Sequence, residues 1–183
     1  ESGEKDFEYF FKNGELEGLG TSWDKSGTRT DTENFKNGKL KVSTMWFKNG
    51  NKMLETHYKD DVRVREGLET SWYPSGKKAG ETNYKNNEKD GVETDWFESG
   101  KKKYEYHYKN GTENGLATHW YPSGTKKLEF HQKGIKQHGL TTWWHENGQK
   151  SIEKHYKGGK EEGLVTEWYE NGKKFAETHY KNG

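Results

Sequence analysis

Histidines recur along the chain with a glutamate two residues before them, a pairing that suits metal binding or acid–base catalysis. Four copies share this spacing, at Glu105/His107, Glu129/His131, Glu153/His155 and Glu177/His179. Residues two apart on a β-strand point to the same face. Each pair therefore offers a carboxylate and an imidazole to one metal ion or one substrate.

The spacing of the copies argues against both kinds of site. Equivalent histidines would lie two strands apart, about 10 Å, which is too far for a shared metal ion. His119 and His145 fall on intervening strands, but each occurs once. A chain that duplicates its polar residues in every copy rarely hides one unique active site. We therefore expect a surface ladder of polar cross-strand pairs, and we predict no catalytic residue, no metal site, no cofactor and no enzymatic activity.

Four aromatic rings, each directly after a tryptophan of a later copy, have a better claim to binding. These residues are Tyr73, Phe97, Tyr121 and Tyr169. Tyrosine is a common anchor of protein interfaces, whereas the alternative is that the rings shield hairpin ends and pack on lysine stems. The candidate binding residues are these four rings together with His107, His131 and His155.

The elements that would position these side chains follow from an internal repeat. Five tryptophans are spaced 24 residues apart, at Trp72, Trp96, Trp120, Trp144 and Trp168. Earlier copies are looser, with Trp23, Trp46 and Trp72 separated by 23 and 26 residues. Residues 1–183 are thus predicted to form one continuous array of about seven and a half repeats. Repeat arrays normally end in atypical capping repeats, and none is recognisable, so we expect a segment of a longer array.

Each repeat predicts two strands joined by a tight turn. Residues 73–77, Tyr-Pro-Ser-Gly-Lys, suit a type I turn followed by a glycine with positive φ, the G1 bulge. A regular hairpin closed by this turn pairs Trp72 with Lys78, Thr70 with Gly80, and Leu68 with Thr82.

This register sorts the residues into two faces, because side chains alternate along a strand. One face, predicted to be the packed interior, would carry Leu68, Thr70 and the tryptophans as structural core: Trp23, Trp46, Trp72, Trp96, Trp120, Trp144 and Trp168. From the return strands it would also carry Leu54, Tyr84, Tyr104, Tyr106, Leu128, Phe130, Ile152 and Ala176. The opposite face would carry the glutamates of the Glu81 position and the histidine ladder, which begins at His57. The reverse arrangement, in which tryptophan and leucine contact a partner, is an open alternative.

Composition narrows the fold class and the partners. Hydrophobic residues make up 26% and charged residues 33%, with 8 Trp, 11 Tyr and 8 Phe, which suits a thin, repeated aromatic layer. Lys and Arg number 31 against 30 Asp and Glu, so no basic stripe favours nucleic acid. No apolar run reaches the roughly 20 residues that span a bilayer, so we expect no membrane insertion. The predicted fold is all-β without helices: an elongated, single-layer antiparallel meander of hairpin repeats that twists and curls.

The repeated pattern Gly-Leu-x-Thr-x-Trp-Tyr-x-x-Gly-Lys-Lys-x-x-Glu-x-x-Tyr-Lys-Asn-Gly resembles the MORN-repeat variant of bacterial proteins, including YwqK-type antitoxins. It differs from the standard MORN motif, because only Gly18-Leu19-Gly20 keeps a Gly-x-Gly. The resemblance implies an elongated β-array that acts by binding, and the antitoxin label implies neutralising a toxin by contact.

Two classes of function fit these observations. One is a non-enzymatic scaffold that binds a protein partner, in an immunity role or as a component of a bacterial assembly. The other is a cell-surface adhesin or carbohydrate binder, since aromatic rows at regular spacing can stack on sugars. Both are compatible with a location in the cytoplasm or in the cell envelope.

Overall fold

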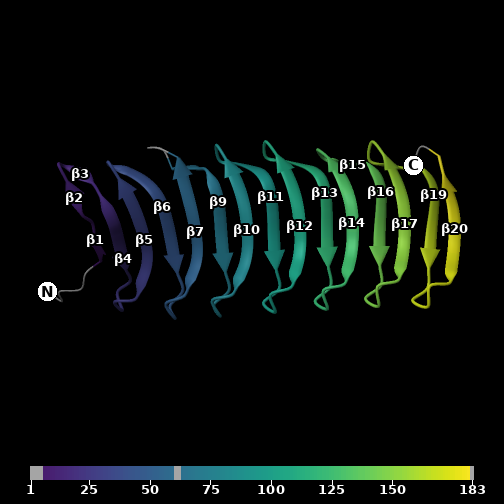
Figure 1. Ribbon diagram of the computed structural model, residues 1–183, viewed down its shortest axis with the longest axis horizontal. Helices are drawn as coiled ribbons and strands as arrows, with labels where there is room; N and C mark the ends of the chain where they lie inside the picture. Colours follow the sequence, from purple (N-terminus) through teal and green to yellow (C-terminus); the bar gives the residue numbers. More distant parts are fainter. Residues whose placement is uncertain (1–5, 60–62, 182–183) are drawn as a thin grey trace. The chain divides into compact units, whose positions relative to one another are not determined.

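All regular elements in the described part of the chain are β-strands. The computed structural model describes residues 6–59 and 63–181 (Figure 1). It divides into two compact units, residues 1–88 and 89–183. That residues 1–183 form one continuous array stays a prediction. None of the described residues belongs to a helix long and apolar enough to cross a membrane.

The first unit is an antiparallel meander with a short additional hairpin. Its strands are β1 (Phe7–Glu8), β2 (Phe11–Lys12), β3 (Glu15–Leu16), β4 (Gly18–Trp23), β5 (Arg29–Lys36), β6 (Lys39–Trp46), β7 (Lys52–Lys59), β8 (Val64–Arg65), β9 (Gly67–Trp72) and β10 (Lys78–Lys85). Strands β4, β5, β6, β7, β9 and β10 pair in that order, with β1 beside β4 and β8 beside the end of β7. Strands β2 and β3 pair only with each other among the described residues.

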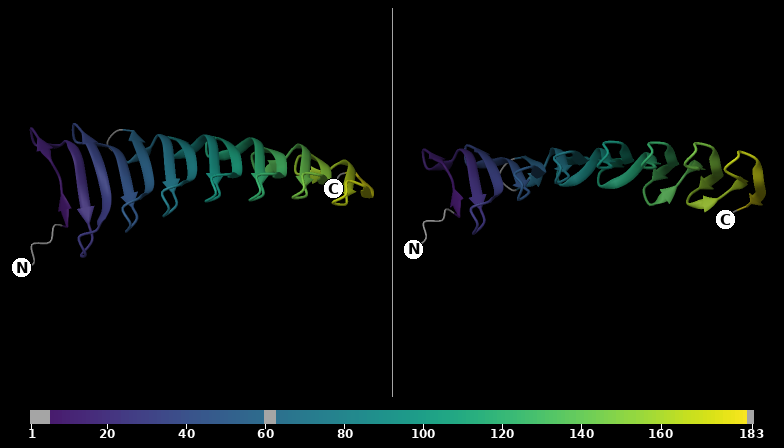
Figure 2. Two further views of the ribbon diagram at one scale, coloured as in Figure 1. Left: turned by 60° about the horizontal axis from the view of Figure 1, so that its bottom comes forward. Right: turned by 90° about the horizontal axis from the view of Figure 1, so that it is seen from below.

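The second unit repeats this plan. Its strands are β11 (Glu88–Trp96), which begins at the last residue of the first unit, β12 (Lys102–Lys109), β13 (Thr112–Trp120), β14 (Lys126–Lys133), β15 (Lys136–Gln137), β16 (Gly139–Trp144), β17 (Lys150–Lys157), β18 (Lys160–Glu161), β19 (Gly163–Trp168) and β20 (Lys174–Tyr180). Each long strand pairs antiparallel with the next long strand. The predicted all-β meander of hairpins is confirmed, and in both units the strands are bent along their length (Figure 2).

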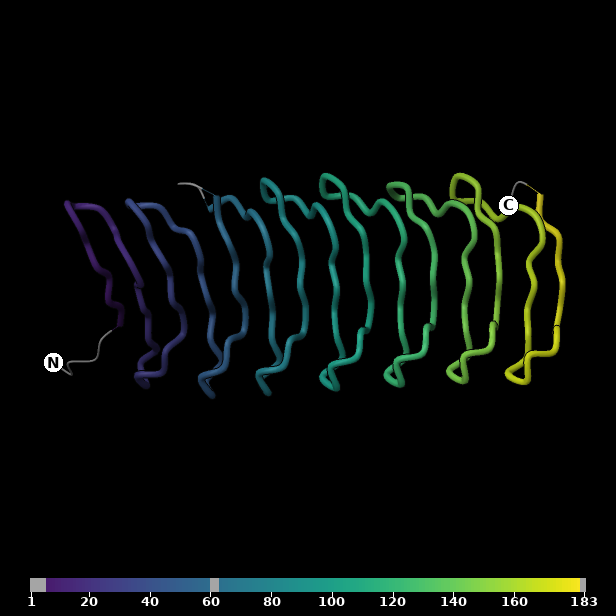
Figure 3. The backbone as a smooth tube through the Cα atoms, viewed as in Figure 1, coloured from purple at the N-terminus to yellow at the C-terminus, as the bar shows by residue number. Residues whose placement is uncertain are grey.

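Two kinds of turn alternate at opposite ends of the strands in each unit (Figure 3). After each tryptophan the predicted turn is present: the Gly76 amide donates to the Tyr73 carbonyl at 2.8 Å, and the Tyr73 amide donates to the Lys77 carbonyl at 2.8 Å. Gly76 has a φ of 82°, the conformation that the G1 bulge requires. At the other end are two-residue turns, several of which have positive φ at both positions, such as Asn86 and Asn87 at 51° and 69°.

The strand register departs from the prediction immediately after the turn. Trp72 pairs with Lys78 as expected, but the next pair is Ser71 with Gly80. The partners that follow are Thr70 with Glu81 and Leu68 with Asn83. The predicted pairing of Thr70 with Gly80 and of Leu68 with Thr82 is therefore wrong. The reason is a second bulge, in which Ala79 is an extra residue on the return strand and shifts every later residue to the opposite face.

This shift reassigns the two faces of each sheet. The face that we call the Trp face carries Leu68, Thr70, Trp72, Glu81 and Asn83 with their equivalents in other repeats. The Tyr face carries Glu69, Ser71, Gly80, Thr82 and Tyr84 with theirs. The prediction that the apolar return-strand residues share a face with the tryptophans is therefore wrong, because these lie on the Tyr face: Leu54, Tyr84, Tyr104, Tyr106, Leu128, Phe130, Ile152 and Ala176.

Burial follows this reassignment. The buried apolar side chains are Phe35, Leu40, Ala117, Phe130 and Val165, all on the Tyr face. A row of buried threonines occupies the middle of the Trp face: Thr32, Thr44, Thr70, Thr94, Thr118, Thr142 and Thr166. The seven tryptophans predicted as structural core are half-buried.

Candidate functional site

A lysine from the preceding repeat lies over the ring of several tryptophans on the Trp face. The ammonium of Lys102 is 5.5 Å from the centroid of Trp120, and the same arrangement joins Lys52 to Trp72, Lys126 to Trp144 and Lys150 to Trp168. Each of these lysines also forms an ion pair with the glutamate three residues later, as Lys102 does with Glu105. Glutamates of the predicted Glu–His pairs therefore hold lysines over tryptophans and link neighbouring repeats.

Beside the tryptophans, one cross-strand pair recurs in all seven hairpins, and we call this row the Leu–His strip. It joins leucine or valine on the first strand to histidine or asparagine on the second. The pairs are Leu19/Asn34, Val42/His57 and Leu68/Asn83 in the first unit, and Val92/His107, Leu116/His131, Leu140/His155 and Leu164/His179 in the second. The predicted binding residues His107, His131 and His155 thus share a row with aliphatic side chains.

The strip is open to solvent, although its leucines are apolar. Leu19 and Leu164 are each 51% exposed, Leu140 is 41% exposed and Leu68 is 37% exposed. In the first unit the strip lines a hollow of about 240 Å³ between hairpins, with Leu19, Asn34, Val42 and His57 in its wall. Regularly spaced apolar side chains beside polar ones are typical of a surface that contacts another macromolecule.

Two strip histidines hold neighbouring hairpins together. His57 Nδ1 lies 2.7 Å from the carbonyl oxygen of Leu68, and His107 Nδ1 lies 2.8 Å from that of Leu116. Gly115 leaves the space for this contact, because a Cβ at that position would lie 3.1 Å from the Cβ of His107. In the described part of the chain, no group of three or more histidine, aspartate or glutamate side chains is placed to hold a metal ion.

The rings after the tryptophans differ in their surroundings. The Tyr121 hydroxyl donates to the Trp144 carbonyl at 2.8 Å and so links two repeats. His145 occupies the same position in the next repeat, and its Nε2 lies 2.9 Å from the Trp168 carbonyl oxygen. Tyr169 is 52% exposed and packs against Phe175 with ring centroids 5.0 Å apart. The other two rings, Tyr73 and Phe97, are half-buried. Their role in binding stays a prediction.

On the Tyr face of the second unit, four rings form a cluster that the other repeats do not copy. Tyr106 contacts Tyr104, His119 and Phe130 with centroid distances of 5.6, 5.4 and 6.3 Å. The Tyr106 hydroxyl lies 2.6 Å from His119 Nε2. Burial, together with the nearby Lys127 ammonium, lowers the pKa of His119, which favours the neutral ring in this contact with Tyr106. The pKa of Tyr104 is raised by burial and by the Asp95 carboxylate, which accepts a hydrogen bond from the Tyr104 hydroxyl.

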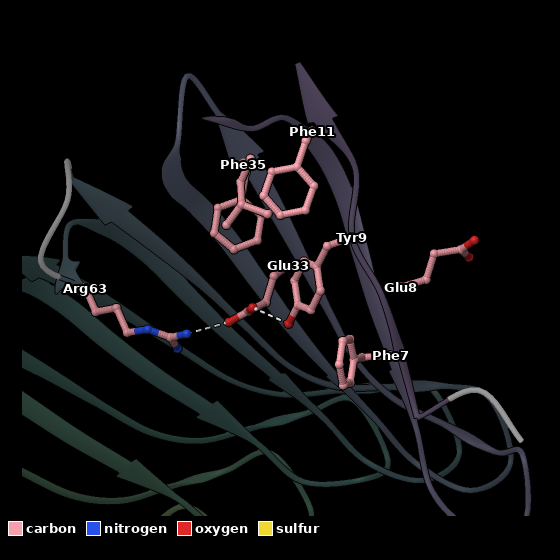
Figure 4. A pocket seen from close by; sticks show the side chains of 8 residues that line it. Phe7, Glu8, Tyr9, Phe11, Glu33, Phe35 and Arg63 are labelled. Carbon is pink, nitrogen blue, oxygen red and sulfur yellow. Dashed lines mark hydrogen bonds and ion pairs between the residues drawn. The ribbon is translucent and has the colours of Figure 1, made fainter. Parts of the chain in front are cut away.

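On the Tyr face of the first unit, aromatic rings line a larger hollow of about 660 Å³ (Figure 4). Its wall contains Phe7, Glu8, Tyr9, Phe11, Leu16, Glu33, Phe35 and Arg63. The Tyr9 hydroxyl donates to Glu33 Oε2 at 3.0 Å, and the Arg63 guanidinium donates to Glu33 Oε1 at 2.8 Å. Burial and the hydrogen bond to Glu33 raise the pKa of Tyr9.

Sequence reasoning missed this hollow, because its residues come from β1, β2, β3, β5 and the segments beside them. A signal was nevertheless present. Phe7, Tyr9 and Phe11 alternate over five residues that precede the first complete repeat, which places three rings on one side of an extended segment.

Comparison with known families agrees with this repeat geometry. Four segments, residues 65–86, 89–110, 137–157 and 161–182, match the family model of the MORN repeat variant. These four segments are similar to MORN-variant repeats. The matches cover a little under half of it, and the unmatched residues 111–136 contain β13 and β14 with the same hairpin register. MORN repeats commonly serve as scaffolds for protein or membrane interaction. No curated protein matches the chain, so the resemblance to YwqK-type antitoxins has no named relative behind it.

Proposed function

We propose that this MORN-variant array is a non-enzymatic scaffold that binds a protein partner along the Leu–His strip. The observation that carries the proposal is the recurrence of one aliphatic–polar pair at the same position of seven hairpins, with four of the five leucines left exposed. A partner that covers the strip removes apolar area from water at each repeat, and the polar residues give orientation.

A row of this kind suits an extended segment or a partner with its own repeats. Each aliphatic side chain contributes a small burial energy, and within each unit the contributions add along the row because neighbouring hairpins are paired strand to strand. Two biological roles fit such binding. One is neutralisation of a toxin by contact, and the other is a structural place in a bacterial assembly.

The proposal is tested by affinity capture with two variants that carry the same kind of substitution. The strip variant is the double substitution Leu140→Asp and Leu164→Asp. The matched control is Ile135→Asp, which alters an apolar side chain that is 94% exposed and lies outside the strip. Since all three residues are exposed, we expect each variant to keep the unfolding midpoint of the parent protein.

We expect the parent protein and the Ile135→Asp control to retain the same partner from cells of the source organism, and the strip variant to lose it. A partner retained equally by all three proteins would place the interface elsewhere. Retention of a glycan in place of a protein would favour the adhesin reading of the aromatic rows.

A further inference from the structure

The aromatic hollow on the Tyr face of the first unit combines ring faces with a partly buried carboxylate. Phe7, Tyr9 and Phe35 form a chain of ring contacts, with centroids 6.0 Å apart for Phe7 and Tyr9 and 5.9 Å apart for Tyr9 and Phe35. The Glu33 side chain is 15% exposed. It lies between the Tyr9 hydroxyl and the Arg63 guanidinium (Figure 4). The hollow thus places a carboxylate, paired with Arg63, beside aromatic rings, and the faces of such rings carry negative potential.

This protein repeatedly places cations over aromatic rings. The Arg29 guanidinium carbon lies 3.5 Å from the centroid of Trp46, and that of Arg65 lies 4.0 Å from the centroid of Tyr84. A planar guanidinium stacks on a ring and still donates hydrogen bonds in its own plane. A hollow that offers both rings and a carboxylate therefore suits a guanidinium better than an ammonium or a neutral group.

Arg63 shows that a guanidinium can reach this carboxylate. Its side chain is 65% exposed, and it approaches Glu33 from the rim of the hollow. A pair with so exposed a member contributes little to stability, so an incoming cation displaces Arg63 at small cost. The volume of about 660 Å³ beside this pair is ample for one arginine side chain.

We infer that the hollow binds an arginine side chain of a protein partner, which replaces Arg63 on Glu33 and stacks on the rings of Tyr9 and Phe35. The site lies on the opposite face from the Leu–His strip, so it does not depend on the proposed function of that strip. A partner that engages both faces would grip the first unit from two sides.

A titration with a single-arginine probe tests the site. The probe is a pentapeptide with blocked ends, Gly-Gly-Arg-Gly-Gly, and its control is the same peptide with citrulline, which keeps the shape and removes the charge. Binding is followed by NMR at the ring protons of Tyr9 and Phe35. We expect saturable shifts with the arginine peptide and at least tenfold weaker binding of the citrulline peptide, since both the ion pair and the cation–ring contact are lost.

Two substitutions give effects of opposite sign. Arg63→Gln removes the internal competitor, and we expect it to tighten arginine-peptide binding by about threefold to tenfold. Glu33→Gln removes the carboxylate, and we expect it to weaken binding about tenfold. The matched control is Glu55→Gln, which removes a carboxylate paired with Lys52 on the other face of the same unit and should leave the affinity unchanged.

Three outcomes would overturn the inference: no shift of the hollow's rings, equal binding of the citrulline peptide, or an Arg63→Gln variant that binds no better than the parent. Because Arg63 is exposed, its substitution leaves the fold intact and keeps the test decisive even if Glu33→Gln perturbs the sheet. Loss of partner capture by the strip variants is a separate result, so failure of either idea leaves the other standing.

Discussion

At the scale of single residues, the thin core of these repeats depends on β-branched and small side chains rather than on large aliphatic ones. Thr141 is fully buried on the Tyr face, and its Oγ1 has no hydrogen-bond partner among the described residues. The residues at the same position of the neighbouring repeats are Ala117 and Val165, which are 2% and 4% exposed. An unpaired buried hydroxyl costs free energy that a methyl group of the same shape does not.

We therefore predict that Thr141→Val stabilises the second unit by about 1 kcal/mol. The reciprocal substitution Val165→Thr should destabilise it by a similar amount, because it buries a hydroxyl at the equivalent position. Denaturant unfolding of the parent and both variants measures the two free energies of unfolding. A loss of stability in Thr141→Val would mean that a buried water satisfies this hydroxyl.

His119 gives the second unit a pH dependence with a defined sign. Its pKa is lowered in the folded protein, chiefly by burial, so the unfolded chain binds a proton more readily than the folded chain does. The stabilising contribution of the neutral ring is therefore complete above a pH of about 6.5, the ordinary pKa of histidine, and declines as the pH falls below it.

We predict that His119→Gln reduces the loss of stability between pH 7.5 and pH 5, because the glutamine amide can both donate a hydrogen bond to the Tyr106 hydroxyl and accept one from it but does not titrate. The measurement is the difference in the free energy of unfolding between variant and parent at the two pH values. If this difference is the same at both, His119 is not a source of acid sensitivity.

At the scale of elements, the turn after each tryptophan could be read from the sequence, but the strand register beyond it could not. Proline, serine and glycine at residues 74–76 define the turn through backbone preferences that are local. The extra residue at Ala79 has no comparable mark, because a bulge is defined by how two strands pair and not by the type of the residue that it leaves unpaired. A single inserted residue then reversed the assignment of Tyr104, Tyr106 and Phe130 to a face.

The candidate surfaces were predictable to different degrees for the same reason. The histidines of the strip were recognised from their spacing, but their pairing with leucine depends on the bulge and emerged only from the structure. The hollow around Glu33 depends on which distant segments meet, and the repeat period carries no information about it. Features repeated in every copy are therefore accessible from sequence, whereas features made once are not.

At the scale of the molecule, stability is distributed along the array. Within the described part of the second unit, β13 pairs with β12 and β14 only, and the ammonium of Lys102 of β12 lies over the ring of Trp120 at its end. Contacts of this nearest-neighbour kind make the stability of an array a sum of repeat terms and interface terms. A defect in one repeat then lowers the local free energy of opening and leaves distant repeats nearly unchanged.

Trp120→Ala tests this distribution. The ring is half-buried, so we expect a cost of about 2 kcal/mol, below the value for a fully buried tryptophan. Amide hydrogen exchange should show faster opening in β12, β13 and β14, while β19 and β20 keep the protection of the parent protein. Lys102→Met is the matched control, since it keeps the aliphatic stem over the ring and removes the ammonium, and it should change exchange much less. Uniform loss of protection across the second unit would instead mean that its hairpins open as a single cooperative body.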